Sequence, residues 1–335
     1  MSEQIKGGFS TVKLYRRQGI AIKEIEVKNI SMSALEILLL KFARSESLVR
    51  ADRVDVEDGK INIRMDCADG DLRKVLRDRS VPYNIRIGWI DDMINGCLYL
   101  HSAGILHWDI KPGNVLIFGD RAKLTDFGLC YRIQDTHKYR SYGTSVFSAP
   151  ELLAGEYARF AADIWALGLT FSVAISDRMP WALPFNKTTA KSDTYKIHRA
   201  WCNYTNQEWI YREIAPEDWI DRIDYGKITR LIISCLQIDP RNRPTIAMLA
   251  STKFCNMIRD RGEIVAVGKM NRCNCLECCF GTNSDTFSAF FDGCYRAPSN
   301  WADNLSYCKQ ILEQNTMPNL NRRKHSTANR YRDRR

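Results

Sequence analysis

The stretch from His107 to Asn114 reads HWDIKPGN, with an acid at Asp109, a lysine at Lys111 and an asparagine at its end. A carboxylate, an ammonium group and an amide oxygen are therefore held within one short stretch. This spacing is typical of a loop at which a phosphoryl group is transferred. The elements expected on either side of the stretch decide which fold could hold such a loop.

Helical patterns dominate on both sides of this stretch. Apolar residues from Ile85 to Ala103 recur at the spacing of one helix face. Two short strands are predicted at Val115–Phe118 and Ala122–Thr125, and helical patterns resume after Pro150. The residues from 67 to 255 are therefore predicted to be mainly helical.

The first 66 residues are predicted to form strands around one helix. A helical spacing of leucines covers Ser33–Arg44, with Ser31 or Ser33 as the expected N-cap. The predicted strands are Ser10–Tyr15, Gly19–Ile25, Val49–Val56 and Lys60–Asp66, the last two joined by the turn Glu57-Asp58-Gly59. A small β-rich lobe followed by a larger helical lobe is a bilobal α+β plan with a cleft between the lobes.

The composition is ordinary for a globular protein up to about Phe254 and changes after it. We expect three units: an N-lobe (1–66), a C-lobe (67–255) and a cysteine-rich, basic C-terminal extension (256–335). Seven of the lysines and arginines lie between Leu320 and Arg335 against one acid, within a net charge of +10. This basic tail is either a solvated end or a weak contact for nucleic acid or an acidic partner, and it could also direct the protein to the nucleus.

The N-terminus has no basic-then-apolar layout, and no stretch approaches the roughly 20 apolar residues of a membrane span. We therefore expect a cytoplasmic or nuclear protein without a membrane contact, in a reducing compartment where its 12 cysteines need not form disulfides.

Five motifs occur in a fixed order along the chain. They are the turn Lys6-Gly-Gly-Phe-Ser-Thr-Val12, Ala21-Ile-Lys23, Glu36, HWDIKPGN and Asp126-Phe-Gly128. In this order, and on the expected strands and helices, they resemble the signature set of the eukaryotic-type protein kinases. The resemblance covers roughly residues 1–255. It continues through Gly143-Thr144, Ala149-Pro-Glu151, Asp163-Ile-Trp-Ala-Leu-Gly168 and Arg243.

The resemblance implies a bilobal kinase fold that binds ATP and Mg²⁺ and phosphorylates protein substrates. Lys23 would contact the α- and β-phosphates and be held by Glu36, although Glu46 is a nearby competitor for that role. Asn114 and Asp126 would bind Mg²⁺ through oxygen atoms. The resemblance assigns nucleotide contacts to Gly7, Gly8, Val12, Ala21, Lys23, Met65, Asp66 and Cys67, with Met65 at the back of the adenine pocket and the last two as hinge.

In the loop itself, Asp109 would orient the acceptor hydroxyl and take its proton, and Lys111 would stabilise the transferred phosphate. The family resemblance further implies that Asp163 braces the loop from a helix and that Glu151 pairs with Arg243. His107 is expected to be a packed core imidazole. The pair Lys111-Pro112, together with Gly143-Thr144, resembles serine/threonine kinases rather than tyrosine kinases.

Two departures from the family pattern indicate a divergent, viral-like member of the family. Of the three glycines expected in the phosphate-covering loop, only Gly7 is in register, because Ile5 and Ser10 occupy the other positions. Trp108 stands where relatives carry an arginine that pairs with a phosphate on the activation segment. The usual phosphorylated position holds Arg140, so both partners are missing together, and we expect an active kinase that does not require this phosphate. Ser141 and Tyr142 remain secondary sites.

Other interpretations stay open. The chain could be a pseudokinase that binds nucleotide or a partner, or an adaptor that acts through its cysteine-rich basic tail. Four cysteines between Cys273 and Cys279 could bind Zn²⁺, stay free, or take part in lipidation or redox chemistry.

Overall fold

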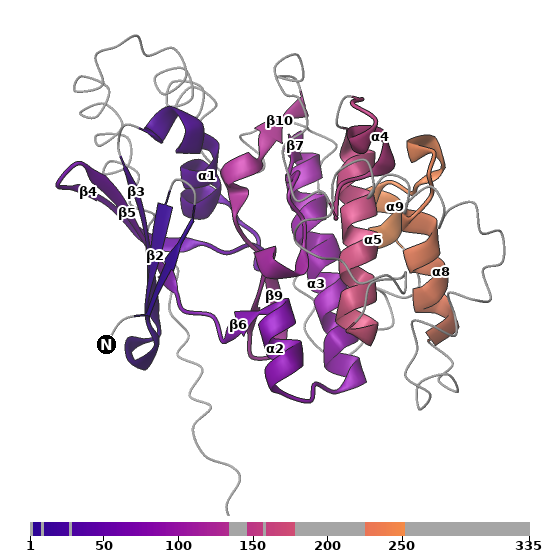
Figure 1. Cartoon of the computed structure of the whole chain (residues 1–335), viewed down its shortest axis with the longest axis horizontal. Coiled ribbons are helices and arrows are strands. Elements are labelled where there is room, and N and C mark those ends of the chain that lie inside the picture. Colours follow the sequence, from indigo (N-terminus) through magenta and orange to yellow (C-terminus); the bar gives the residue numbers. More distant parts are fainter. Residues whose placement is uncertain are drawn as a thin grey trace, which may run out of the picture.

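An antiparallel five-stranded sheet forms the N-terminal part of the chain (Figure 1). Its strand order is β1-β2-β3-β5-β4. The strands are β1 (Glu3–Lys6), β2 (Ser10–Tyr15), β3 (Ile20–Glu26), β4 (Ala51–Glu57) and β5 (Lys60–Asp66). The turn between β4 and β5 places Asp58 and Gly59 at φ 50° and 71°. Two successive positive φ angles suit the right-handed twist of a hairpin, so the predicted turn is confirmed.

The structure is a computed structural model that describes residues 3–7, 10–26, 29–133, 146–156, 159–177 and 225–251. The expected boundary near Phe254, the cysteine cluster and the basic tail lie outside these residues, as do Gly8, Arg140, Ser141, Tyr142 and Gly143-Thr144. The predictions that fall on them stay predictions.

Helix α1 (Ile30–Phe42) packs against the sheet. Its residues from Ala34 to Leu40 are all buried, including Ile37 and Leu39 at 0% exposure. Because this helix is covered on all sides, Glu36 is carried into the interior with the leucines. The helix begins earlier than predicted, at the N-cap residue Asn29, which makes no side-chain capping bond. The prediction of Ser31 or Ser33 as N-cap is therefore wrong.

The second part of the chain is mainly helical, as predicted. Its helices are α2 (Leu72–Asp78), α3 (Tyr83–Ser102), α4 (Pro150–Leu153), α5 (Phe160–Ser176), α8 (Tyr225–Cys235) and α9 (Ile246–Ala250). Helix α5 packs against α3 on one side and α8 on the other, and α3 also contacts α9 (Figure 1). Every residue of α5 from Ala162 to Ile175 is buried. No helix within the described residues has the length and apolarity to cross a bilayer.

Short strands and 3₁₀ turns lie between the larger elements of both parts. The strands are β6 (Gly70–Asp71), β7 (Ile105–Leu106), β8 (Val115–Phe118), β9 (Arg121–Leu124) and β10 (Tyr131–Arg132). The 3₁₀ turns are η1 (Arg16–Gln18), η3 (Pro112–Asn114), η4 (Phe127–Leu129) and η7 (Pro240–Asn242). Strands β6, β8 and β9 form one sheet, and β7 pairs with β10. A sheet-rich N-terminal region and a helical region after it confirm the predicted α+β class.

Candidate active site

A buried ion pair joins the sheet to helix α1. Lys23 on β3 extends its ammonium group to the carboxylate of Glu36, and the two side chains are only 12% and 5% exposed. Burial alone would lower the pKa of Lys23, but Glu36 and Asp126 raise it above its ordinary value. Burial raises the pKa of Glu36, and Lys23 offsets only part of this rise. The lysine therefore keeps its charge, and the glutamate is the partner that takes up a proton as the pH falls. The competitor Glu46 pairs with Arg50 instead.

Asp126 lies on the other side of Lys23. One of its carboxylate oxygens is 3.6 Å from the Lys23 Nζ atom, and its side chain is 49% exposed. Its φ of 62° is in the left-handed region, which is uncommon for a residue other than glycine. The next residue, Phe127, is 1% exposed, with its ring centroid 5.6 Å from that of His107. The backbone turn thus buries the aromatic ring while Asp126 faces solvent beside a positive charge.

The expected nucleotide contacts lie mostly on one face of the sheet. In the register of the strands, Lys23 is opposite Val12, and Ala21 is opposite Met65. Residues that are directly opposite, or two apart along a strand, share a face. Val12, Ala21 and Met65 therefore form an apolar surface next to the Lys23 ammonium group. Ile5, opposite Val12, adds an apolar side chain that is 52% exposed.

The turn and hinge residues border this surface. The Gly7 N–H donates to the Ser10 carbonyl at 2.8 Å, which closes the turn between β1 and β2. At the other end, the Cys67 N–H donates to the Gly19 carbonyl at 2.9 Å. Asp66, between Met65 and Cys67, is exposed.

Within the loop, the side chains of three candidate site residues form one hydrogen-bonded group. Lys111 Nζ is 2.6 Å from the Asp109 carboxylate. The amide nitrogen of Asn114 donates to the backbone carbonyl of Asp109 at 2.8 Å and to its carboxylate at 3.0 Å. Because the amide nitrogen is occupied in this way, the amide oxygen is the atom of Asn114 that can bind a cation.

The β8–β9 hairpin brings Asn114 close to the residue that precedes Asp126. The Thr125 N–H donates to the Asn114 carbonyl at 3.0 Å, which continues the ladder between β8 and β9. The Thr125 carbonyl lies 3.1 Å from Nε2 of His107, whose side chain is fully buried. The prediction that His107 is a core imidazole is confirmed, and its ring supports the strand end that carries Asp126.

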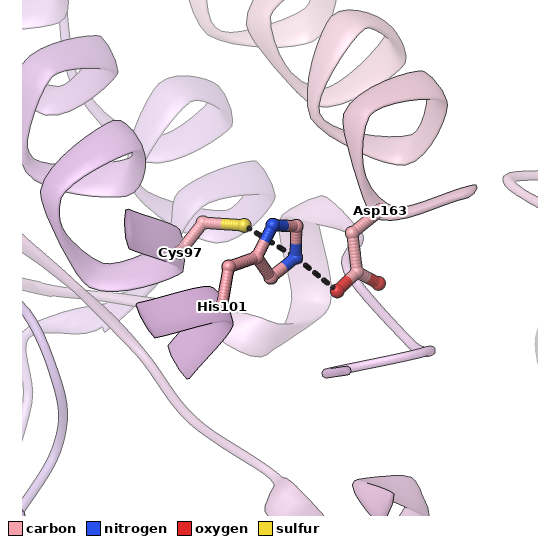
Figure 2. A group of neighbouring side chains, drawn as sticks. All are labelled: Cys97, His101 and Asp163. Atoms are coloured by element: carbon pink, nitrogen blue, oxygen red, sulfur yellow. Dashed lines mark hydrogen bonds and ion pairs between the residues drawn. The ribbon is translucent and has the colours of Figure 1, made fainter. Parts of the chain in front are cut away.

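Asp163 on α5 holds the start of the loop. Its two carboxylate oxygens accept the backbone N–H groups of His107 and Trp108, each at 2.9 Å. His101 on α3 adds a third bond, from Nε2 at 2.9 Å (Figure 2). Burial raises the pKa of Asp163, but the bonds from His101 and the loop outweigh it and leave the pKa below its ordinary value. Asp163 thus braces the loop as a carboxylate, as expected.

Cys97, His101 and Asp163 are close enough to suggest a metal site (Figure 2). However, the same His101 nitrogen is 3.3 Å from the Cys97 sulfur and 2.9 Å from Asp163. Burial raises the pKa of Cys97 well above its ordinary value, so the thiol keeps its proton in this hydrogen-bonded arrangement. These three residues therefore form a hydrogen-bonded support for the loop.

The donor set that fits Mg²⁺ is Asp126 with Asn114. Both offer hard oxygen atoms, and the half-exposed carboxylate of Asp126 leaves room for the waters and phosphate oxygens that Mg²⁺ retains.

Glu151 and Arg243 form a separate, buried bidentate pair with two contacts of 2.7 Å. This confirms their expected pairing and anchors the start of α4.

Three residues of the site were not predicted. His101 orients Asp163, Thr125 links Asn114 to His107, and Tyr131 packs against Trp108 with ring centroids 4.6 Å apart. The only sequence signal for His101 was its place four positions after Cys97, in line with the apolar face predicted for Ile85–Ala103.

Three relatives illustrate the similarity to known proteins. The chain is 29% identical to the serine/threonine-protein kinase kin-29 of Caenorhabditis elegans, over 52% of this chain and 23% of that protein. It is 28% identical to the maternal embryonic leucine zipper kinase of Danio rerio, over 72% and 35% of the two chains. It is 32% identical to the mitogen-activated protein kinase HOG1 of Eremothecium gossypii, over 50% and 39%. The chain therefore spans less than half the length of each of these relatives.

The family model for the protein kinase domain matches residues 5–255, which include the Lys23–Glu36 pair, the loop from His107 to Asn114, and Asp126. With this match over three quarters of its length, the chain belongs to the protein kinase domain family.

Proposed function

We propose that the protein is a serine/threonine protein kinase that transfers the γ-phosphoryl group of ATP to hydroxyl groups of protein substrates. The observation that carries this proposal is the position of Lys23, in contact with Glu36 and 3.6 Å from Asp126. A lysine that is fixed between these two acids presents its charge where phosphate oxygens and a cation would meet.

The proposed roles combine the surroundings of the described residues with the family resemblance. Lys23 binds the α- and β-phosphates, while Asp126 and the amide oxygen of Asn114 hold Mg²⁺. The cation neutralises charge on the phosphates when it is bound. Val12, Ala21 and Met65 supply the apolar surface for the adenine ring, with Gly7 and Gly8 at the phosphates and Asp66 and Cys67 at the hinge.

The loop residues act on the acceptor. Asp109 accepts the proton of the acceptor hydroxyl, and it is kept in place by Asn114. Lys111, 2.6 Å from the Asp109 carboxylate, is near enough to stabilise charge on the transferred group. The serine/threonine preference is supported by Lys111-Pro112 and by the serine/threonine-protein kinase among the relatives.

We also propose that activity is independent of phosphorylation of the activation segment. Trp108 is neutral and packs at a tilt against the Tyr131 ring, so it offers no charge for a phosphate. The test is transfer from radiolabelled ATP before and after phosphatase treatment, and a loss of turnover on treatment would refute this part of the proposal.

The main experiment compares wild type with Asp126→Asn and Asp109→Asn in the same radiolabel assay with Mg²⁺, followed by phosphoamino acid analysis. Loss of the general base should lower transfer by about 100- to 10,000-fold. Asp120→Asn is the matched control, because it removes an exposed carboxylate from the other end of the β8–β9 hairpin.

The alternative is a pseudokinase that binds nucleotide without transfer, which the loss of two glycines from the phosphate-covering loop favours. Nucleotide binding by wild type with no transfer above the level of Asp109→Asn would establish that alternative.

A further inference from the structure

Trp108 contacts both its own loop and the segment that follows Asp126. Its backbone N–H donates to Asp163 at 2.9 Å. Its indole packs against the Tyr131 ring at 4.6 Å between centroids, with an angle of 59° between the planes. Both aromatic residues are buried, at 9% and 5% exposure. A pair of large rings in this arrangement contributes packing well beyond that of small side chains.

Tyr131 is itself fixed to the chain that leads into the loop. It lies on β10, where it pairs with Leu106 of β7. Leu106 directly precedes His107. Tyr131 is therefore bound to the start of the loop twice, through the strand pairing with Leu106 and through the ring contact with Trp108. The first strand after Asp126 is thereby attached to the loop by backbone and side-chain contacts together.

The far end of the same segment meets Trp108 across a narrow cavity beside Asp109. Phe147, Ala149 and Leu152 line this cavity together with Trp108, and Ala162 and Ala166 of α5 complete its apolar wall. Among the described residues that line it, the charged ones are the acids Asp109 and Asp163, and there is no lysine or arginine. A phosphate in this space would face two carboxylates, so the space favours apolar packing over anion binding.

The backbone conformation of Trp108 links the packing of its ring to the position of Asp109. Trp108 has a φ of 62°, a left-handed conformation that costs energy for any residue with a bulky side chain. Such a conformation persists only where the surroundings hold it, and Asp109 is the next residue along. Release of the ring would let the backbone relax and would move the Asp109 carboxylate.

We propose that Trp108 is a positioning residue whose indole clamps both ends of the segment from Asp126 to Glu151 onto the loop and so fixes Asp109. The clamp rests on the proposed kinase function and explains how the site is held without a phosphate. It uses aromatic packing against Tyr131 at one end and the cavity that Trp108 lines together with Phe147 and Leu152 at the other.

The test compares Trp108→Phe with Trp108→Asn after phosphatase treatment. Phenylalanine keeps a ring against Tyr131, whereas asparagine tolerates the left-handed backbone but has no ring. We expect Trp108→Asn to lower kcat by about 100-fold, the effect of a small displacement of a catalytic group, with KM for ATP nearly unchanged. Trp108→Phe should retain most of the kcat. If Trp108→Asn has wild-type kcat, only the backbone conformation matters and the clamp is overturned.

Tyr131→Leu provides the second arm. It should lower kcat as Trp108→Asn does, and the double variant should be no worse than either single one, because both remove the same contact. Additive losses would contradict the clamp. Trp89→Leu, a buried tryptophan of α3, controls for loss of a large ring elsewhere and should leave kcat unchanged in the folded fraction.

A readout that is independent of catalysis separates this inference from the proposed function. Trypsin can cut at Lys138 and Arg140, between Tyr131 and Phe147. Trp108→Asn and Tyr131→Leu should speed cleavage there relative to wild type and Trp89→Leu, whether or not the protein transfers phosphate. Unchanged cleavage would overturn the clamp, while an inactive wild type with faster cleavage in the variants would refute only the proposed function.

Discussion

Asp163→Asn should release the loop from α5 and lower both the Tm and the kcat. The carboxylate accepts three N–H groups in a fully buried position, from His107, Trp108 and His101. Hydrogen bonds to a buried charged group are worth about 1.5–3 kcal/mol each. Asparagine keeps one oxygen and places an NH₂ group where the other was. Either the Trp108 N–H, or the N–H groups of both His107 and His101, therefore lose their acceptor and face a donor.

These losses predict a decrease of about 3–5 kcal/mol in the free energy of unfolding. For a domain of this size, about 2–4 °C of Tm accompanies each kcal/mol, so Tm should fall by roughly 10 °C. The loop would also shift, and kcat in the radiolabel assay should fall by about 100-fold.

Asp92→Asn is the matched control for stability alone. Asp92 is a buried carboxylate of α3 that accepts a bidentate contact from Arg121 and the N–H of Ala122. Its loss should lower Tm by a similar amount and leave kcat of the folded protein intact. If Asp163→Asn and Asp92→Asn lower kcat equally, or if Asp163→Asn changes Tm by less than about 2 °C, the bracing role of Asp163 is wrong.

The pH dependence gives an independent check on the same residue. The pKa of Asp163 is lowered from 3.8 in the folded protein, so the stability that it provides is complete above that value. It is lost as the pH falls through the lower, folded pKa. The Tm difference between wild type and Asp163→Asn should therefore stay constant from pH 7 to about pH 5 and shrink only in stronger acid. A difference that disappears near neutral pH would contradict the lowered pKa.

Three further outcomes are expected. Glu151→Gln should cost about 3–5 kcal/mol in unfolding free energy, because it leaves the Arg243 guanidinium, 0% exposed, without its charged partner; a Tm within about 2 °C of wild type would contradict this. Burial raises the pKa of Cys235 to about 12, so iodoacetamide at pH 8 should label the partly buried Cys67 and spare Cys235 until the protein is unfolded, as peptide mass spectrometry can show. ATP with Mg²⁺ should slow the labelling of Cys67. Gly168→Ala would place a new Cβ atom 2.7 Å from that of Cys235, so it should lower the unfolding free energy by about 1–3 kcal/mol in a denaturant titration, and an unchanged midpoint would exclude the close approach of α5 and α8.

The longer elements could be predicted from the sequence because their patterns are periodic. Helix α3, the strands β2, β5 and β8, and the Asp58-Gly59 turn lie at or within a few residues of their predicted positions. The strands β6, β7 and β10 were not predicted because each has only two residues, and the α2 helix was not predicted because its seven residues make only two turns.

The contacts that shape the site were harder to predict from the sequence. Motif order pointed to Lys23, Glu36 and Asp126, and the structure places them together, although their catalytic roles remain proposals. The packing of Trp108 on Tyr131 and the bond from His101 to Asp163 depend on how distant elements dock, which no local pattern encodes. The N-cap of α1 was misassigned because the helix begins after Asn29, which makes no side-chain capping bond, so no capping interaction marks its start.

The bond between Asp163 and the N–H of His107 spans 56 residues of sequence. During synthesis the loop leaves the ribosome well before the carboxylate that shapes it, and α5 is too apolar to remain exposed in water once it emerges. The loop can therefore reach its working geometry only after α5 has docked between α3 and α8, late in the maturation of the chain. A nascent chain that ends before residue 160 would contain His107–Asn114 in full but would lack the carboxylate that holds this loop.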